Sequence, residues 1–243
     1  MTAKKDDVLD KNYHLMVLLQ SRAPGTYNHS RNVSSLMEAV ASEAGLDEEK
    51  MKIAGLYHDI GKTVNARYFT ENQEPGEKNP HDDLKAPEML RFITAHVGDT
   101  AQILINDPNI DPEIVRWCTQ HHGNCVLRPA MFKAEDSDPE KWRYKCHRPA
   151  SQEAALLMVC DHLEARSNSL SQQKKLPEDI SELVETVFRE LEADDQLEDI
   201  AFKFGELKRI KKVLARELSS QFPGTRTPYP EDEKENEKKR KKK

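Results

Sequence analysis

The chain has 243 residues, of which 37% are hydrophobic and 33% are charged, and its formal net charge at pH 7 is −6. This composition is typical of a soluble globular protein with a sizeable core, and the negative charge argues against nucleic-acid binding by its body. No apolar run approaches the ~20 residues that a membrane span requires, and no apolar segment follows the charged N-terminus as in a secretory signal. We therefore expect no membrane span and a cytoplasmic location.

Helical spacing of apolar residues begins clearly at a stripe over 33–40. Gly45 follows this stripe at the position where glycine commonly ends a helix. Asp47 is placed to cap a second helix, and Gly61 predicts the point where that helix stops.

An irregular segment over about 64–86 follows, and long loops of this kind in compact domains are often functional. The next apolar face covers 89–97. Asp111 then combines a capping side chain with a proline at the first helical position, and Gly123 is expected to close the helix that begins there.

A second irregular stretch covers 124–148, after which Ser151 is placed to cap another helix. Pro177 predicts the start of the next one. Amphipathic helices over 178–191 and 205–218 either pack internally or pair across a homodimer, and both arrangements remain open. The sequence has no strand pattern of useful length and no internal repeat. We therefore expect an all-α fold, a compact bundle of about eight helices.

Histidine and aspartate residues of metal-binding type recur along these elements. His96, His121 and Asp161 each lie on an apolar stripe, and a buried carboxylate costs several kcal/mol unless it is paired or binds a metal. Any one of them alone would be explained as a hydrogen-bonded core residue or a buried salt bridge. Four helical segments each supply such a residue, however, and His29 is expected just before the first helix. We interpret as metal ligands His29, His58, Asp59, His96, His121, His122 and Asp161.

This number of ligands exceeds the needs of one catalytic ion, which keeps a position open for water, so we expect two divalent ions. Nitrogen and oxygen ligands suit Fe, Mn, Co, Ni or Zn and do not single out Mg. Two ions about 3.5–4 Å apart can share Asp59 and stabilise both the attacking and the leaving oxygen of a phosphoryl transfer. The ligand set thus predicts phosphate-ester hydrolysis. Lys62 either neutralises a phosphate oxygen in this site or is a solvated lysine at a helix end, and its spacing leaves both open.

Two other features have a simpler interpretation. His81 and Asp82 form a second His-Asp pair, but they lie in the proline-containing loop and are explained by turn chemistry. The last residues, 231–243, are acidic and then basic. We expect them to form a disordered tail rather than an RNA-binding segment, so nucleic acid is not an expected partner.

The motif His-Asp-Ile-Gly-Lys (58–62), with the order of the flanking histidines and the final aspartate, resembles the HD/HDIG metal-dependent phosphohydrolase superfamily. The resemblance is closer to the intracellular HD domain of bacterial seven-transmembrane receptors, whose members hydrolyse cyclic di-AMP. It covers roughly residues 12–230. It is also carried by the segments 23–30, 68–73, 79–82, 121–123 and 153–155.

This resemblance implies that Lys62 contacts the scissile phosphate and that Tyr68 contacts a nucleobase or sugar. The segment 143–149 departs from a Pro/Gly-rich loop of that branch, and a change there can alter the substrate while sparing the metals. The Gly-Tyr-Pro signature of cyclic-di-GMP enzymes is absent. The resemblance further implies two ligand sets, His29, His58, Asp59 and Asp161 for one metal and Asp59, His96, His121 and His122 for the other.

The sequence therefore predicts a dinuclear Mn- or Fe-dependent phosphodiesterase that acts on a cyclic dinucleotide, with cyclic di-AMP as the first candidate. A metal-bridging hydroxide is expected to attack phosphorus in line and produce linear pApA. Two alternatives are a nucleotide phosphomonoesterase with a tighter pocket and a signalling module that binds the cyclic dinucleotide without hydrolysis. The expected segments are an N-terminal extension (1–11), the HD domain (12–230) and the charged tail (231–243).

Overall fold

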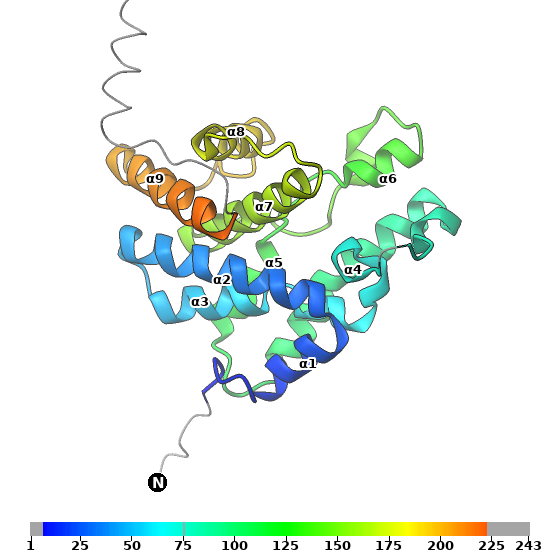
Figure 1. Ribbon diagram of the computed structural model, residues 1–243, viewed down its shortest axis with the longest axis horizontal. Coiled ribbons are helices and arrows are strands. Elements are labelled where there is room, and N and C mark those ends of the chain that lie inside the picture. The colour runs from blue at the N-terminus through cyan, green and yellow to red at the C-terminus, as the bar shows by residue number, and fades with distance from the viewer. Residues whose placement is uncertain (1–6, 75, 223–243) are drawn as a thin grey trace, which may run out of the picture.

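A computed structural model describes residues 7–74 and 76–222 of the chain (Figure 1). These residues contain nine α-helices, so the all-α class and the bundle architecture are confirmed. The helices are, in chain order, α1 (His14–Arg22), α2 (Pro24–Ala44), α3 (Glu48–Tyr57), α4 (Ala86–Ile105), α5 (Pro112–Gln120), α6 (Arg128–Lys133), α7 (Gln152–Gln172), α8 (Ile180–Ala193) and α9 (Phe204–Gln221).

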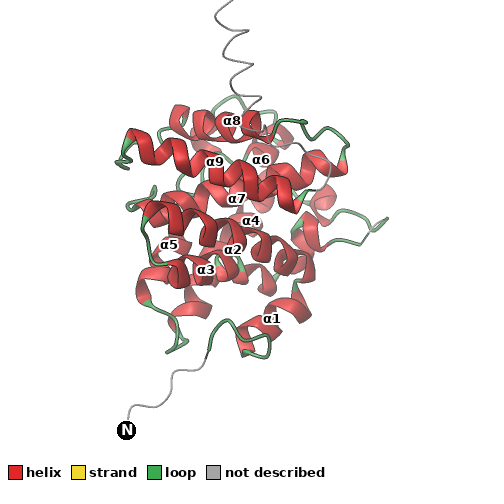
Figure 2. Cartoon of the chain, turned by 60° about the vertical axis from the view of Figure 1, so that its left-hand side comes forward, coloured by secondary structure: helices red, strands yellow, loops and turns green. Residues whose placement is uncertain are grey.

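The helices are stacked in layers, with α8 and α9 above, α7 in the middle, and α2 and α3 below (Figures 1 and 2). α2 contacts α3 on one side and α7 and α9 on the other. α7 is the central helix, because every residue from 154 to 161 is buried. Asp161 therefore lies on the central helix, where little solvent is available to stabilise its charge.

The predicted caps at Asp47, Asp111 and Ser151 and the predicted helix end at Gly45 are confirmed, whereas the helix expected to close at Gly123 ends earlier, at Gln120. Asp47, Asp111 and Ser151 each accept a hydrogen bond from a backbone N–H two or three residues later, and each precedes its helix directly. Gly45 ends α2 with a φ of 69°, a left-handed conformation that glycine adopts without steric cost.

The start of the first predicted helix was wrong. α1 precedes it, and α2 begins at Pro24, so His29 lies inside α2 rather than ahead of it. Pro24 occupies the first helical position, where a missing N–H has no cost. The first turns of α2 bury the polar residues Thr26, His29 and Ser30, so no apolar stripe marks them in the sequence.

The role predicted for Gly61 was also wrong. α3 ends at Tyr57, and Gly61 lies in the following 3₁₀ helix, η1 (Ile60–Val64). A Cβ atom at Gly61 would lie 2.1 Å from the carbonyl oxygen of His96 and 2.4 Å from the amide nitrogen of Thr100. Glycine is therefore needed because η1 packs directly onto α4, which brings the His-Asp motif next to His96.

Both segments predicted to be irregular contain short helices. The first includes the 3₁₀ helices η2 (Ala66–Tyr68), η3 (Thr70–Asn72) and η4 (Pro80–Asp83). The second contains α6 and the 3₁₀ helix η5 (Pro139–Trp142). α6 packs on the start of α4 in a small second core formed by Ala86, Met89, Ala130 and Trp142.

The last two helices bury their apolar faces within the chain, α8 through residues such as Val184 and α9 through residues such as Leu214. Of the two arrangements expected for these helices, packing within the chain is the one observed. A homodimer stays a prediction. α8 begins three residues after Pro177. No helix among the described residues is long and apolar enough to cross a membrane. The proposed segment boundaries stay predictions, and the tail 231–243 lies outside the described residues.

Candidate metal centre

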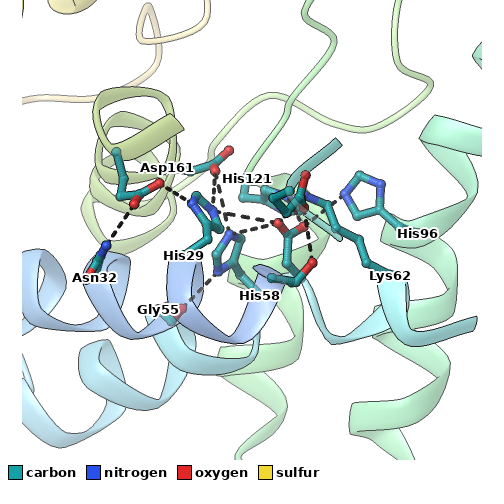
Figure 3. A network of polar contacts seen from close by, with 12 residues as sticks. His29, Asn32, Gly55, His58, Lys62, His96, His121 and Asp161 are labelled. Atoms are coloured by element: carbon teal, nitrogen blue, oxygen red, sulfur yellow. Dashed lines mark hydrogen bonds and ion pairs between the residues drawn. The ribbon is translucent and has the colours of Figure 1, made fainter. Parts of the chain in front are cut away.

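The seven residues predicted as metal ligands lie together in the structure, and they come from five helices or helix ends. Figure 3 labels His29, His58, His96, His121 and Asp161 among them. α2 carries His29, the end of α3 carries the His-Asp pair, α4 carries His96, the end of α5 carries the His doublet, and α7 carries Asp161. Their ligand atoms form two groups, each with all atoms within 4.8 Å of one another. The groups are Asp59, His96, His121 and His122, and His29, His58, Asp59 and Asp161.

Asp59 belongs to both groups, and its two carboxylate oxygens face different histidines. Oδ1 lies 3.2 Å from Nε2 of His96 and 3.5 Å from Nε2 of His121. Oδ2 lies 3.4 Å from Nε2 of His58 and 3.8 Å from Nε2 of His29. A carboxylate arranged in this way would serve both groups of metal ligands.

Asp161 closes the cluster from the side of α7. Its Oδ1 lies 3.0 Å from Nε2 of His29 and 3.7 Å from Nε2 of His58. Its Oδ2 lies 3.6 Å from Nδ1 of His122. Burial would raise the pKa of Asp161, but the neighbouring imidazoles of His29 and His58 hold it well below its ordinary value. The carboxylate is therefore ionised and able to bind a cation.

Several atoms that face the centre are buried and have no hydrogen-bond partner among the described residues. They are Nε2 of His58, His96 and His121, and Oδ1 of Asp59. Nε2 of His29 lies 3.0 Å from Oδ1 of Asp161, and Oδ2 of Asp59 is paired with Lys62. A buried polar atom without a partner costs about 1–3 kcal/mol, so this concentration of such atoms needs an explanation. Divalent metal ions supply one, because imidazole nitrogen and carboxylate oxygen are their usual ligands.

Three of the histidines are oriented by the backbone in the same way. Nδ1 of His58, His96 and His121 donates to the carbonyl three residues earlier, at 2.9, 2.5 and 2.6 Å respectively. This hydrogen bond at Nδ1 fixes the ring and directs the other nitrogen, Nε2, towards the centre of the cluster. His122 differs, because it turns Nδ1 towards Asp161.

His29 is oriented by a carboxylate that the sequence analysis missed. Nδ1 of His29 donates to Oε2 of Glu164, whose Oε1 accepts a hydrogen bond from Nδ2 of Asn32 at 2.9 Å. Burial lowers the pKa of His29, but Asp161 and Glu164 outweigh this effect and raise it to about 10. Glu164 lies one turn after Asp161 on the buried face of α7, so its spacing from Asp161 in the sequence could have identified it.

Lys62 points into the same centre. Its Nζ lies 2.6 Å from Oδ2 of Asp59 and 3.0 Å from Oε1 of Glu71, and its side chain is only 13% exposed. This burial excludes the alternative of a solvated lysine. Burial would raise the pKa of Asp59, but Lys62 and His58 beside it hold the pKa well below its ordinary value.

A cavity of about 600 Å³ opens onto the centre and continues along α7 and α8. Tyr144 forms part of its wall, with the ring centroid 4.5 Å from that of His122, and this residue was not singled out from the sequence. Tyr68, predicted to contact substrate, does not line the cavity, because its ring stacks on Phe92 at 4.5 Å. Its neighbour Phe69 lines the cavity instead. Substrate contact by Tyr68 stays a prediction that this arrangement does not favour.

Comparison with known proteins agrees with this geometry. The model of the HD domain family matches residues 26–166, a range that contains all seven residues of the two metal-binding groups. The chain belongs to the HD domain family.

The relatives of this HD domain include two proteins called cyclic-di-AMP phosphodiesterase PgpH. The one from Listeria monocytogenes is 31% identical over 235 residues, which cover 95% of this chain and 32% of the relative. The one from Bacillus subtilis is 33% identical over 229 residues, which cover 93% of this chain and 32% of the relative. The chain thus spans about a third of the length of these relatives.

A solved structure is similar over the whole fold. It is the crystal structure of the L. monocytogenes phosphodiesterase PgpH HD domain in complex with cyclic-di-AMP. The TM-score is 0.78 at 31% sequence identity, and the match covers 88% of this chain and 100% of that chain. The helical bundle described above is therefore the HD domain fold.

Proposed function

We propose that the chain is a dinuclear metal-dependent phosphodiesterase that hydrolyses a cyclic dinucleotide, with cyclic di-AMP as the first candidate, to linear pApA. The observation that carries this proposal is the pair of ligand groups that share Asp59 beside a cavity of about 600 Å³. The similarity to the PgpH proteins, named as cyclic-di-AMP phosphodiesterases, supports the choice of substrate.

The residues of the centre fit two divalent ions, with Mn²⁺ and Fe²⁺ as the first candidates because the donors are imidazoles and carboxylates. Bound ions would activate a water molecule and neutralise charge that builds on the phosphoryl oxygens. One ion would be held by His29, His58, Asp59 and Asp161, and the other by Asp59, His96, His121 and His122.

The protein's own contribution is to orient these groups and the phosphate. Asp59 stays ionised inside the fold and presents one oxygen to each group of ligands. Lys62 places an ammonium group at the edge of the cavity, where it can neutralise a non-bridging phosphate oxygen in the transition state. Hydrolysis adds the oxygen of water to phosphorus and breaks the bond to the 3′-oxygen, which leaves as a hydroxyl group.

The size of the cavity favours a dinucleotide over a mononucleotide. A volume of about 600 Å³ lies in the range for ligands of drug size. The cavity also extends well beyond the metal centre, to Arg166 on α7 and Glu190 on α8, which form an ion pair at its far part. A phosphomonoesterase that is selective for mononucleotides would have less need of the part of the cavity next to Arg166 and Glu190.

The test is turnover of cyclic di-AMP by the Mn²⁺-loaded protein, with cyclic di-GMP and AMP as competing substrates and chromatographic analysis of the products. Asp59→Ala removes the shared ligand. Asp82→Ala is its matched control, because it alters the exposed aspartate of the other His-Asp pair. The expected result is pApA from the wild type and Asp82→Ala, and none from Asp59→Ala.

Other results would select a different function. Phosphate release from AMP without attack on the cyclic dinucleotides would indicate a phosphomonoesterase. Tight binding of cyclic di-AMP without hydrolysis, in protein shown to contain two metal ions, would indicate a binding module.

A further inference from the structure

We propose that Glu71 is a positioning residue that holds the ammonium group of Lys62 towards the phosphate of the substrate. The inference rests on the proposed phosphodiesterase activity, in which Lys62 contacts the scissile phosphate. Glu71 lies in η3, within the loop between the His-Asp motif and α4. It lies in the segment 68–73 that contributes to the family resemblance, but the sequence analysis assigned it no role.

Lys62 is shared between two carboxylates, and only one of them is free for this task. Its Nζ lies 2.6 Å from Oδ2 of Asp59 and 3.0 Å from Oε1 of Glu71. Both oxygens of Asp59 also face histidines of the metal-binding groups. If each group held an ion, Asp59 would be engaged by both, and Glu71 would remain as the carboxylate that fixes the direction of Lys62.

The same loop segment holds Lys62 by a second contact. Nζ of Lys62 lies 5.0 Å from the centroid of the Phe69 ring, a distance at which a cation is attracted to an aromatic face. Lys62, Phe69 and Glu71 all line the cavity. The ammonium group is thus contacted by Phe69 and Glu71 as well as by Asp59, and Lys62 lines the cavity where a ligand can reach it.

Glu71 is itself fixed by the first turn of α2. Oγ1 of Thr26 donates to Oε1 of Glu71 at 3.0 Å. The backbone N–H of Thr26 donates to Oδ1 of Asn72 at 3.0 Å, and Nδ2 of Asn72 donates back to Oγ1 of Thr26 at 2.8 Å. These three hydrogen bonds preorganise the carboxylate, because neither the loop nor the side chain can move without breaking them.

Gly25 makes this contact between α2 and the loop possible. A Cβ atom at Gly25 would lie 1.7 Å from the carbonyl oxygen of Glu71 and 2.4 Å from its carbonyl carbon. Both atoms belong to the backbone, so no side-chain rotation can relieve the overlap. His29 lies one turn further along α2, so one helix positions both a predicted metal ligand and the partner of Lys62.

A positioning role and a purely electrostatic role of Glu71 predict opposite effects of Glu71→Gln on phosphate binding and on the rate. Glu71→Gln makes the site more positive, and a purely electrostatic role would tighten phosphate binding and leave the rate unchanged or higher. A positioning role predicts the reverse, because an ammonium group that is no longer held in the productive direction stabilises the transition state less.

The experiment measures kcat and KM for cyclic di-AMP and the affinity for inorganic phosphate in the Mn²⁺-loaded protein. Glu71→Gln is expected to lower kcat by about 10- to 100-fold, to weaken phosphate binding and to leave the metal content unchanged. In a Lys62→Met background, Glu71→Gln should have no further effect on either quantity. Glu74→Gln, an exposed glutamate of the same loop, is the matched control and should behave as wild type.

A second pair of variants tests the contact from the side of α2. Gly25→Ala should reproduce the loss seen in Glu71→Gln, because the added Cβ must displace the backbone of Glu71. Gly98→Ala is its control, since a Cβ there meets no atom within 4 Å. Tighter phosphate binding or an unchanged kcat in Glu71→Gln would overturn the proposal, as would an equal loss in the Lys62→Met background or a loss of metal.

Phosphate binding also separates this inference from the proposed function. A wild-type protein that does not hydrolyse cyclic di-AMP would refute the proposed activity. The effect of Glu71→Gln on phosphate affinity, with and without Lys62, would still decide whether Glu71 positions Lys62.

Discussion

Replacing Glu164 by glutamine is expected to weaken one metal-binding group and spare the other. Glu164 is 1% exposed, and its two oxygens accept hydrogen bonds from Nδ1 of His29 and from Nδ2 of Asn32. Glutamine keeps the shape but removes the negative charge, and it offers one acceptor oxygen in place of two. His29 therefore loses the carboxylate that makes its Nε2 a stronger ligand.

The size of the effect follows from the kind of contact that is lost. Removing the partner that orients a metal-binding histidine typically costs about 10- to 100-fold in metal affinity, or about 1.4–2.7 kcal/mol. At a free metal concentration about ten times the wild-type Kd, occupancy of that group falls from about 90% to between about 50% and 10%. The group with His96 and His121 should stay filled, because backbone carbonyls orient both rings.

The assay is the number of Mn²⁺ ions per chain after equilibrium dialysis at a series of buffered metal concentrations. Glu192→Gln, which changes an exposed glutamate on α8, is the control and should bind metal as wild type does. The reasoning is refuted if Glu164→Gln binds both ions with wild-type affinity. It is also refuted if both ions are lost together, because the two groups would then not depend on separate contacts.

Three further predictions concern the shared carboxylate, the close approach at Gly61 and the metals. Asp59→Asn should lower the rate of cyclic di-AMP hydrolysis by at least about 100-fold, measured as initial rates, because the residue serves both groups. Gly61→Ala should reduce the free energy of unfolding by about 1–3 kcal/mol in chemical denaturation, because the new Cβ overlaps the backbone of α4. A metal ion at about 100 times its Kd should raise the free energy of unfolding by about 2.7 kcal/mol per site. Chelation should therefore lower Tm by about 5–11 °C for each ion removed.

Each of these predictions has a clear contrary result. Near-wild-type rates in Asp59→Asn would mean that the cluster is not the reaction centre. Gly98→Ala on α4 is the control for Gly61→Ala, because it adds the same methyl group where no atom lies within 4 Å. Equal stability of the two variants would contradict the argument from close approach. A Tm that is unaffected by chelation would show that the buried, unpaired ligand atoms do not bind metal.

Helix starts were predictable where a neighbouring side chain caps them. Asp47, Asp111 and Ser151 cap the helices they precede, because a short polar side chain bonds a backbone N–H only two or three residues away. α6 was not predictable in this way. It has six residues, too few for a periodic pattern, and it packs on Trp142, in the loop that follows it, and on Met89, which is remote in sequence.

The candidate ligands were predictable because their residue types are unusual for the places they occupy. Asp161 on a buried face needs a cation, and the same holds for the histidines on the other apolar stripes. Glu71 carries no such signal, and Glu164 has only its place one turn after Asp161 on the buried face of α7. Their partners lie 45 and 135 residues away in sequence, as Thr26 and His29 respectively, so their roles exist only once the helices have packed.

Residue types and their order along the chain were therefore enough to indicate metal-dependent phosphate chemistry, because ligand preference is a property of the side chain itself. The tertiary structure decided which atoms face one another. Packing of η1 onto α4 at Gly61 brings Asp59 beside His96, and packing of α2 against α7 brings His29 beside Asp161. A distance of a few ångströms between helices decides whether such side chains can share an ion, and that distance is set by contacts between residues remote in sequence.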